Sequence, residues 1–223
     1  MPSDTVENYL KAILVVQLQA EDSTASVPMG LLARRLGVVP GTATTMAKHL
    51  EKAGLAAYAP RVGLQLTDEG RKLAIQVLRR HRLIEYFLVE TLGMDWADIH
   101  DEAERLEHAI SDRVLERIDA LLGHPEVDPH GDPIPAADGR IPSVDTQSLA
   151  DSEPGQAVVV ERVLRQDPAF LQFVEETGLS PGSRVEIVRQ ETAGGLVEVR
   201  EPGKRARRSI GREPAEQIRV RRG

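Results

Sequence analysis

The segment HDEAERLEH, at positions 100–108, places two histidines and two glutamates at a spacing that suits a helix. The four residues stand at relative positions 0, 4, 7 and 8, so an α-helix brings their side chains to one face. Imidazole nitrogens and carboxylate oxygens that converge in this way form a ligand set for a divalent transition metal. Upstream, His81 and Glu85 repeat the spacing of four residues. The predicted metal-binding face comprises His100, Glu104, Glu107 and His108.

Cysteine is absent from the 223 residues, which excludes a disulfide framework and a thiolate metal site. A metal would need nitrogen and oxygen ligands, which leaves Mn, Fe, Co, Ni or Zn open. Only 3% of the residues are aromatic, whereas 41% are hydrophobic, so the cores must be aliphatic. No apolar run of about 18 residues indicates a membrane span, and the N-terminus lacks the basic-then-apolar order of a signal peptide. We therefore expect a cytoplasmic protein without a membrane partner.

Charge is segregated along the chain. The net charge of −7 argues at first against binding to nucleic acid. However, Lys and Arg outnumber Asp and Glu between residues 29 and 93 and again from Lys204 onward, whereas acidic residues concentrate between 95 and 138. DNA responds to a local basic patch rather than to the net charge. DNA binding therefore stays open, and the basic C-terminal residues could contact phosphates or dock on the acidic segment.

The first 72 residues predict a winged helix-turn-helix. Apolar periodicity favours helices over 4–20 and 28–36, and a third over 42–53 that follows the turn GVVPG. Two short strands, 55–58 and 64–67, are expected to form a hairpin with Arg61 at its tip. The helix over 42–53 would be the recognition helix.

The start of the recognition helix carries residues that can approach DNA closely. Hydroxyl groups and threonine methyl groups can reach base edges and phosphates, and a helix N-terminus favours phosphate. The alternative is that GVVPGTATT only caps a helix that packs against its neighbour. Together with the hairpin tip, the candidates for DNA contact are Pro40, Thr42, Thr44, Thr45, Lys48, His49 and Arg61.

Residues 73–140 predict a helical domain. Long helices are expected over 68–92 and 95–122, and the turn-rich segment HPEVDPHGDPIP ends the helical region. Its two histidines, His124 and His130, are expected at the surface. Two helices in so small a unit cannot bury all their apolar surface, so an apolar stripe beside the His/Glu face favours a homodimer interface. The stripe consists of Ala103, Leu106, Ile110 and Val114.

The last part of the chain predicts a small β-barrel after a linker. Over 141–155, small, polar and proline residues follow no period. From residue 156 the pattern changes to strands at AVVVERVL, SRVEIV, GGLVEVR and QIRVRR, with a short helix from Pro168 to Thr177. The expected fold class is α+β, with a winged helix-turn-helix at 1–72, a helical domain at 73–140 and a barrel at 156–223.

The order of these motifs resembles the diphtheria toxin repressor family of metal-dependent transcriptional regulators, which has iron-responsive and manganese-responsive branches. The resemblance covers essentially the whole chain. It implies an SH3-like C-terminal domain and two metal sites between the first helix and the dimerisation domain. It rests on LEKAGLAAYAPRVGLQLTDEGRKLA, RRHRLIEYFL, HDEAERLEHAISDRVLERI, HGDPIP and LSPGSRVEIV, in this order.

Carried over by motif, the resemblance implies a ligand set for each site. An acidic residue of the SH3-like domain sometimes completes the first set, and here that residue would be Asp167. The implied ligands are His81, Glu85, His100 and Asp167 in one site, and Asn8, Glu104, Glu107 and His108 in the other.

Some of these side chains also have ordinary structural roles open to them. Asp167 precedes Pro168 and is therefore a candidate helix N-cap. Glu85 could pair with Arg82 or Arg105. His100 and Glu104 could be solvated residues of an acidic helix.

Two positions on the first helix differ from the manganese branch, which usually has acidic residues where this chain has Asn8 and Lys11. A protonated lysine cannot bind metal. The iron branch often has methionine at the position of Asn8 and cysteine at that of Glu104, and oxygen in place of sulfur favours Mn(II) or Fe(II) over softer ions. We therefore expect two separate Mn(II) or Fe(II) sites per subunit, in the layout of the iron branch.

The predicted function is metal-dependent regulation of transcription, as a repressor of metal-homeostasis genes. A homodimer would bind a two-fold symmetric operator in double-stranded DNA once metal fixes the separation of its two winged helices. A metal-dependent hydrolase is an alternative because His/Glu clusters also activate water, although no nucleophile or oxyanion motif supports it. A winged-helix regulator of a small organic ligand is another, but it leaves the His/Glu face unexplained.

Overall fold

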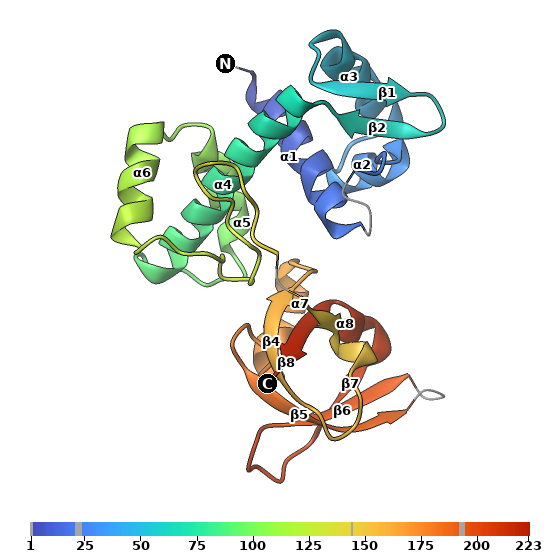
Figure 1. Cartoon of the computed structure of the whole chain (residues 1–223), viewed down its shortest axis with the longest axis vertical. Coiled ribbons are helices and arrows are strands. Elements are labelled where there is room, and N and C mark those ends of the chain that lie inside the picture. Colours follow the sequence, from blue (N-terminus) through green and yellow to red (C-terminus); the bar gives the residue numbers. More distant parts are fainter. Residues whose placement is uncertain (1, 21–23, 144, 192–194) are drawn as a thin grey trace. The chain divides into compact units, whose positions relative to one another are not determined.

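The structure, a computed structural model, describes residues 2–20, 24–143, 145–191 and 195–223 (Figure 1). The chain divides into two compact units, and the division falls inside two helices. The first unit comprises Met1–His81, Glu107–Ile110 and Pro135–Arg140, and the second comprises Arg82–Leu106, Ser111–Ile134 and Ile141–Gly223.

A winged helix-turn-helix forms most of the first unit, as predicted. Pro40 occupies the first turn of the third helix, where its fixed φ and missing N–H are compatible with helix formation. This helix therefore begins two residues before the expected start at 42. The elements are α1 (Asp4–Gln19), α2 (Met29–Arg35), α3 (Pro40–Lys52), β1 (Ala56–Ala59) and β2 (Gly63–Leu66).

The core of this domain is aliphatic and determines which face of α3 reaches solvent. Ile13 and Leu14 of α1 are fully buried, and α3 contributes Ala43, Ala47 and Leu50 to the same cluster. The buried positions of α3 recur at intervals of three and four residues, as on one face of a helix. The opposite face of α3 is consequently left exposed.

The β1–β2 hairpin is the wing, and it is anchored to the segment before α2. Val27 and Leu64 exchange backbone hydrogen bonds of 2.8 and 3.0 Å. Gly63 has a φ of 139°, and a Cβ there would lie 2.4 Å from the carbonyl oxygen of Val27, so only glycine fits. Arg61 has a φ of 67° at the tip of the hairpin, the position expected for it.

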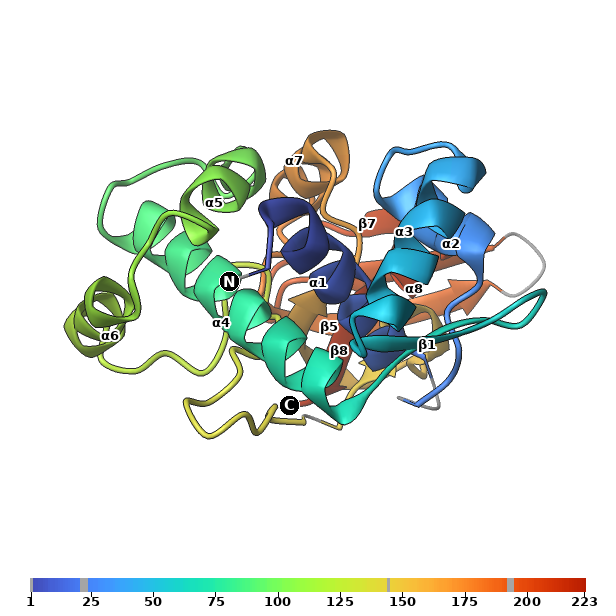
Figure 2. The same ribbon diagram turned by 90° about the horizontal axis from the view of Figure 1, so that it is seen from above.

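Helix α4 (Asp68–Glu90) runs through both units, and α5 (Ile99–Glu107) and α6 (Asp112–Leu121) follow it. The prediction of a single helix over 95–122 is wrong, because the helical region is interrupted between α5 and α6 (Figure 2). A new helix, α6, begins after Ser111, because the Ser111 side chain accepts a hydrogen bond from the backbone N–H of Val114 and caps the helix. Glu107 and His108 therefore lie at the C-terminal end of a short helix.

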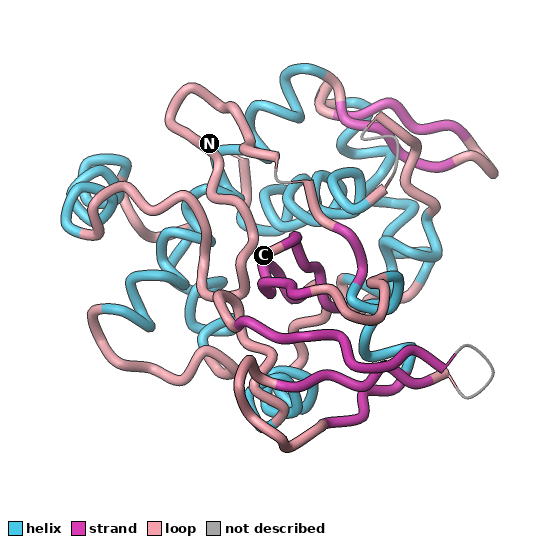
Figure 3. The backbone as a smooth tube through the Cα atoms, turned by 60° about the horizontal axis from the view of Figure 1, so that its bottom comes forward, coloured by secondary structure: helices cyan, strands magenta, loops and turns pink. Residues whose placement is uncertain are grey.

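The C-terminal domain is built on a six-stranded antiparallel sheet in the order β3-β8-β4-β5-β6-β7, drawn in magenta in Figure 3. Its core is aliphatic, with Val160, Ile187 and Val220 almost completely buried. Helix α7 (Pro168–Glu176) begins where the sequence predicts it. The strands are β3 (Gln147–Ser148), β4 (Ala157–Val163), β5 (Arg184–Glu191), β6 (Leu196–Arg200), β7 (Arg208–Gly211) and β8 (Ile218–Arg222).

Parts of this domain differ from the sequence prediction. The predicted linker, 141–155, contains β3 and the short 3-10 helix η1 (Leu149–Asp151), whose Leu149 is fully buried. Strand β7 and helix α8 (Arg212–Glu216) were also not predicted. Within the described ranges, the pairing of strands leaves β3 and β7 as edges, so the SH3-like sheet is not a closed barrel. None of the described helices has the length and apolar character needed to span a membrane.

Candidate metal centre

A fully buried carboxylate, Glu107 at the end of α5, is the centre of a cluster in the first unit. The ammonium of Lys11, on α1, lies 2.8 Å from each of its two carboxylate oxygens. Nδ1 of His81, on α4, lies 2.6 Å from Glu107 Oε2 and 3.2 Å from Lys11 Nζ. Side chains from three helices thus meet at one buried ion pair.

The charge of Glu107 is stabilised by these neighbours. Burial by itself would raise the pKa of Glu107, but the hydrogen bond from His81 and the ammonium of Lys11 outweigh it and hold the pKa below its ordinary value. Glu107 is therefore a carboxylate at neutral pH, although its side chain has no exposed surface.

His108, one residue further, is surrounded by oxygen atoms of α1 and of Glu107. Its Nδ1 lies 2.8 Å from Glu7 Oε2, and its Nε2 lies 2.8 Å from Asn8 Oδ1 and 3.3 Å from Glu107 Oε1. A neutral imidazole carries one N–H, which the Glu7 carboxylate accepts at Nδ1. The lone pair of Nε2 then points at the lone pairs of two oxygen atoms, Asn8 Oδ1 and Glu107 Oε1. A cation between these three atoms would stabilise the arrangement.

The donor set around His108 Nε2 fits a divalent ion. Neighbouring ligand atoms of an octahedral ion with bonds of about 2.1 Å are roughly 3 Å apart. The separations of 2.8 and 3.3 Å between Nε2 and the oxygens of Asn8 and Glu107 match this value. A carboxylate on the other imidazole nitrogen, here Glu7, is the usual partner of a metal-bound histidine. Glu7 was not predicted from the sequence, although its position next to Asn8 is a signal in retrospect.

The position beside this donor set does not fit a second ion. The Lys11 ammonium already occupies the space between both oxygens of Glu107 and Nδ1 of His81. A lysine ammonium offers hydrogen-bond donors and no lone pair, so it competes with a metal for the Glu107 oxygens instead of coordinating one.

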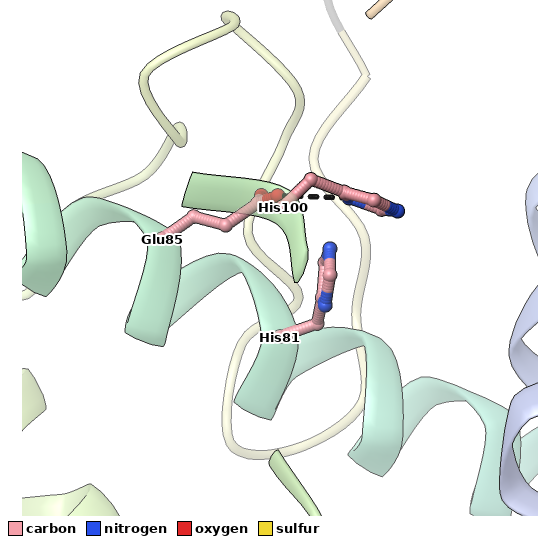
Figure 4. A group of neighbouring side chains, drawn as sticks. All are labelled: His81, Glu85 and His100. Carbon is pink, nitrogen blue, oxygen red and sulfur yellow. Dashed lines mark hydrogen bonds and ion pairs between the residues drawn. The ribbon is translucent and has the colours of Figure 1, made fainter. Parts of the chain in front are cut away.

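The second group of candidate ligands lies around Glu85 on α4 (Figure 4). Glu85 is almost completely buried, and its Oε1 lies 3.3 Å from His100 Nδ1. His81 lies one turn earlier on α4, and a ring nitrogen of its side chain points toward the other two residues in Figure 4. Possible ligand atoms of His81, Glu85 and His100 lie within 4.8 Å of one another.

Glu85 also belongs to a group in the second unit that sequence reasoning missed. Possible ligand atoms of Glu85, Asp128 and His130 lie within 4.8 Å of one another, and all three residues are buried. The expectation that His130 lies at the surface is wrong, since it is only 1% exposed. Its Nε2 lies 3.0 Å from the Trp96 carbonyl oxygen, and its Nδ1 is buried without a hydrogen-bond partner among the residues that the structure describes.

The turn DPHGDP holds this histidine in place. Asp128 Oδ1 accepts hydrogen bonds from the backbone N–H groups of His130 and Asp132, both at 2.9 Å. Gly131 packs so closely that a Cβ would lie 1.9 Å from the Glu161 carbonyl oxygen. Burial, with the neighbouring charges of Asp132 and then Glu85, raises the pKa of Asp128 well above its ordinary value. The motif HGDPIP was the signal available in the sequence.

Comparison with known proteins identifies the family. Models described as "Iron dependent repressor, N-terminal DNA binding domain" and "Iron dependent repressor, metal binding and dimerisation domain" match residues 1–64 and 67–136, and a FeoA domain matches 147–222. The iron-dependent repressor IdeR of Mycobacterium tuberculosis is 33% identical over 214 residues, which cover 90% of each chain. The chain belongs to the iron-dependent repressor family.

Further relatives of the repressor come from both branches. The diphtheria toxin repressor of Corynebacterium glutamicum is 32% identical over 200 residues, which cover 84% of this chain and 85% of that protein. A solved structure described as a manganese-dependent transcriptional repressor in complex with manganese is 38% identical, with a TM-score of 0.89 over 97% of this chain and 99% of that one. The predicted family, fold class and general function of the repressor are confirmed.

Two predicted ligands of the repressor make other contacts in the structure. Glu104 lies with Oε1 3.7 Å from His100 Nε2, on the same helix, and its side chain is 41% exposed. Asp167 caps α7 by accepting a hydrogen bond from the backbone N–H of Phe170, the structural role that the sequence left open. It also pairs with Arg165, whose hydrogen bond is the main cause of a lowered pKa for Asp167.

The candidate DNA-contacting residues of the repressor lie on the open face of α3 and on the wing. The hydroxyl groups of Thr44 and Thr45 donate to the backbone oxygens of Pro40 and Gly41, which leaves their methyl groups available to a partner. Thr44 is half-buried. The exposed members of the set are Pro40, Thr42, Thr45, Lys48, His49 and Arg61.

Proposed function

We propose that this chain is a repressor whose binding to operator DNA depends on Mn(II) or Fe(II). The observation that carries the proposal is that Asn8 Oδ1 and Glu107 Oε1 both lie within 3.3 Å of His108 Nε2. A bound ion of this class supplies two positive charges and near-octahedral bonds to oxygen and nitrogen. In holding it, these residues would connect the first helix of the DNA-binding domain to the end of α5.

The other residues of the cluster prepare this connection. Glu7 accepts the Nδ1 proton of His108 and so keeps the Nε2 lone pair directed toward Asn8 and Glu107. Burial of Glu107 excludes water from its oxygens, which strengthens their attraction for a cation. The hard oxygen and nitrogen donors support Mn(II) or Fe(II) over softer ions.

We propose a second ion at Glu85, so that each subunit holds two. His81 and His100 are the partners predicted for Glu85, and Asp128 and His130 offer a carboxylate and an imidazole to the same residue. A metal analysis of the purified protein tests the number: wild type should hold two Mn(II) per subunit, and Glu85→Gln should hold one. Equal contents in both proteins would contradict this assignment.

The DNA partner is proposed to be a two-fold symmetric operator bound by a homodimer. Two copies of α3 would enter major grooves of half-sites separated by one or more helical turns, about 34 Å each. Leu106 and Val114, which are 43% and 49% exposed, supply apolar surface for the contact between subunits. The cytoplasm is the proposed site of action, because it contains the DNA on which a repressor acts.

Operator binding titrated with metal tests the function. A mobility-shift or fluorescence titration of wild type against operator DNA should show tight binding with Mn(II) or Fe(II), under anaerobic conditions for Fe(II), and weak binding with a chelator. His108→Ala should lose this dependence, whereas His124→Ala should keep it, because His124 is exposed and pairs with Asp119. Equal affinity of wild type with metal and with chelator would refute the proposal.

A further inference from the structure

Lys11 occupies an unusual position for a lysine. It lies in the middle of α1, its side chain is only 9% exposed, and it faces a carboxylate with no exposed surface. Lysines are almost never buried unless they are paired. Its ammonium lies 2.8 Å from both oxygens of Glu107 and 3.2 Å from an imidazole nitrogen of His81. Two carboxylate oxygens around a positive charge are also part of the surroundings of a metal ion.

The charges of this cluster need a cation whether or not metal is present. A buried carboxylate that loses its partner is strongly destabilising, because its charge then has no compensation in a low-dielectric environment. Lys11 belongs to the chain and cannot diffuse away, so its compensation of Glu107 does not depend on the metal supply. It also joins the same two helices, α1 and α5, that the Asn8–Glu107–His108 donors would join.

We propose that the Lys11 ammonium takes the place of a metal ion. It holds α1 against Glu107 in the absence of metal, and it prevents a second divalent ion from binding beside the Asn8–Glu107–His108 donors. The first statement concerns the metal-free chain and is independent of the proposed function. The second rests on the proposed function, because it presupposes an ion at those donors.

The ion pair between Lys11 and Glu107 affects how the protein responds to metal. One part of the contact between α1 and the end of α5 is permanent, and only the part at Asn8 and His108 depends on metal. Binding of Mn(II) there should therefore follow a simple one-site curve, without the cooperativity of two neighbouring ions that share Glu107.

Substitutions of Lys11 in the full-length protein test the proposal. Lys11→Met keeps the length of the side chain and removes the charge, and Lys11→Glu replaces the ammonium with a potential metal ligand. Lys72→Met is the matched control, because the side chain of Lys72 is 72% exposed. The readouts are backbone hydrogen exchange of α1 in chelator and in Mn(II), and the Mn(II) content per subunit.

In chelator, wild type and Lys72→Met should protect α1 amides similarly, and both Lys11 variants should lose about tenfold or more of this protection. Mn(II) should restore α1 in Lys11→Glu, which should then contain one more ion per subunit than wild type. Unchanged protection in Lys11→Met, or an unchanged ion count in folded, metal-loaded Lys11→Glu, would overturn the proposal.

Wild type alone provides a measurement that does not depend on the folding of variants. In chelator, α1 amides around Lys11 should already be protected to within about tenfold of their level with Mn(II). A gain of more than about a hundredfold on adding Mn(II) would mean that Lys11 does not hold α1. If wild type binds no Mn(II) but keeps this protection in chelator, the proposed function fails while the role of Lys11 in the metal-free chain stands.

Discussion

The carboxylate of Glu7 lies 2.8 Å from Nδ1 of His108 and thereby determines which imidazole nitrogen can take a metal. Glu7 and His108 are 101 residues apart in sequence, yet they form a carboxylate–imidazole pair of the kind that supports metal-bound histidines. The relationship assigns Glu7 a role in orienting a ligand without itself binding metal.

Glu7→Gln should weaken Mn(II) binding at this position by about 10- to 100-fold, because a neutral amide accepts the Nδ1 proton less strongly and orients the imidazole less firmly. Isothermal titration calorimetry measures the affinity. Asp4→Asn removes an exposed carboxylate from the same helix and should leave the affinity unchanged. Identical affinities of Glu7→Gln and wild type would show that Glu7 does not support His108.

Asp128→Asn should stabilise the metal-free protein at neutral pH. Folding raises the pKa of Asp128, mainly by burial, so keeping its charge costs more in the folded chain than in the unfolded one. This cost is fully present above the folded pKa and disappears as the pH falls toward the ordinary value of about 3.9. The asparagine oxygen can still accept the two backbone hydrogen bonds.

Thermal unfolding in chelator between about pH 3.5 and 8 checks this prediction. The difference in Tm between Asp128→Asn and wild type should be largest at the upper end and vanish at the lower end. Asp101→Asn, an exposed position, should give no such trend. A difference that is independent of pH would mean that charge is not the cause.

Leu106→Asp with Val114→Asp should convert the dimer to a monomer, because two charges would have to be buried in the contact between subunits. Sedimentation velocity measures the oligomeric state. Leu92→Asp is the control, since Leu92 is 58% exposed and lies outside the predicted stripe. If the double variant remains dimeric at a protein concentration at which wild type is dimeric, the interface lies elsewhere.

Lys48→Ala should weaken DNA binding similarly for operator and random sequences and should lower the salt slope by about 1, because a phosphate contact releases about one counterion. Fluorescence anisotropy at several salt concentrations gives the slope. Lys72→Ala has the same charge change outside α3 and should leave the slope unaltered. A loss confined to the operator sequence would indicate that Lys48 contacts bases instead.

The winged helix-turn-helix was predictable because its signals are local. Apolar periodicity, Pro40 and the hairpin residues act within a few positions of one another. The break before Ser111 was missed, because the apolar stripe continues in phase across it and hides the cap. Strand β3 was missed because two residues cannot show a period, and its pairing with β8 is a contact over long sequence separation.

The candidate site was predictable as a set of residues but not as a set of contacts. His81, Glu107 and His108 could be found from spacing, since helical positions follow from sequence. The burial of His130 depends on tertiary packing, which single-residue patterns do not encode. Lys11 was recognised as a residue that cannot bind metal, but its ion pair with Glu107 required the fold.

The break between α5 and α6 has an electrostatic consequence. Backbone dipoles add along a helix and leave about half a negative charge at its C-terminal end. Because α5 ends at Glu107, this end lies at the residue that faces the Lys11 ammonium. In an uninterrupted helix over 95–122, the negative end of the dipole would lie near residue 122 instead of at Glu107. The backbone therefore attracts cations at the same place as the Glu107 side chain does.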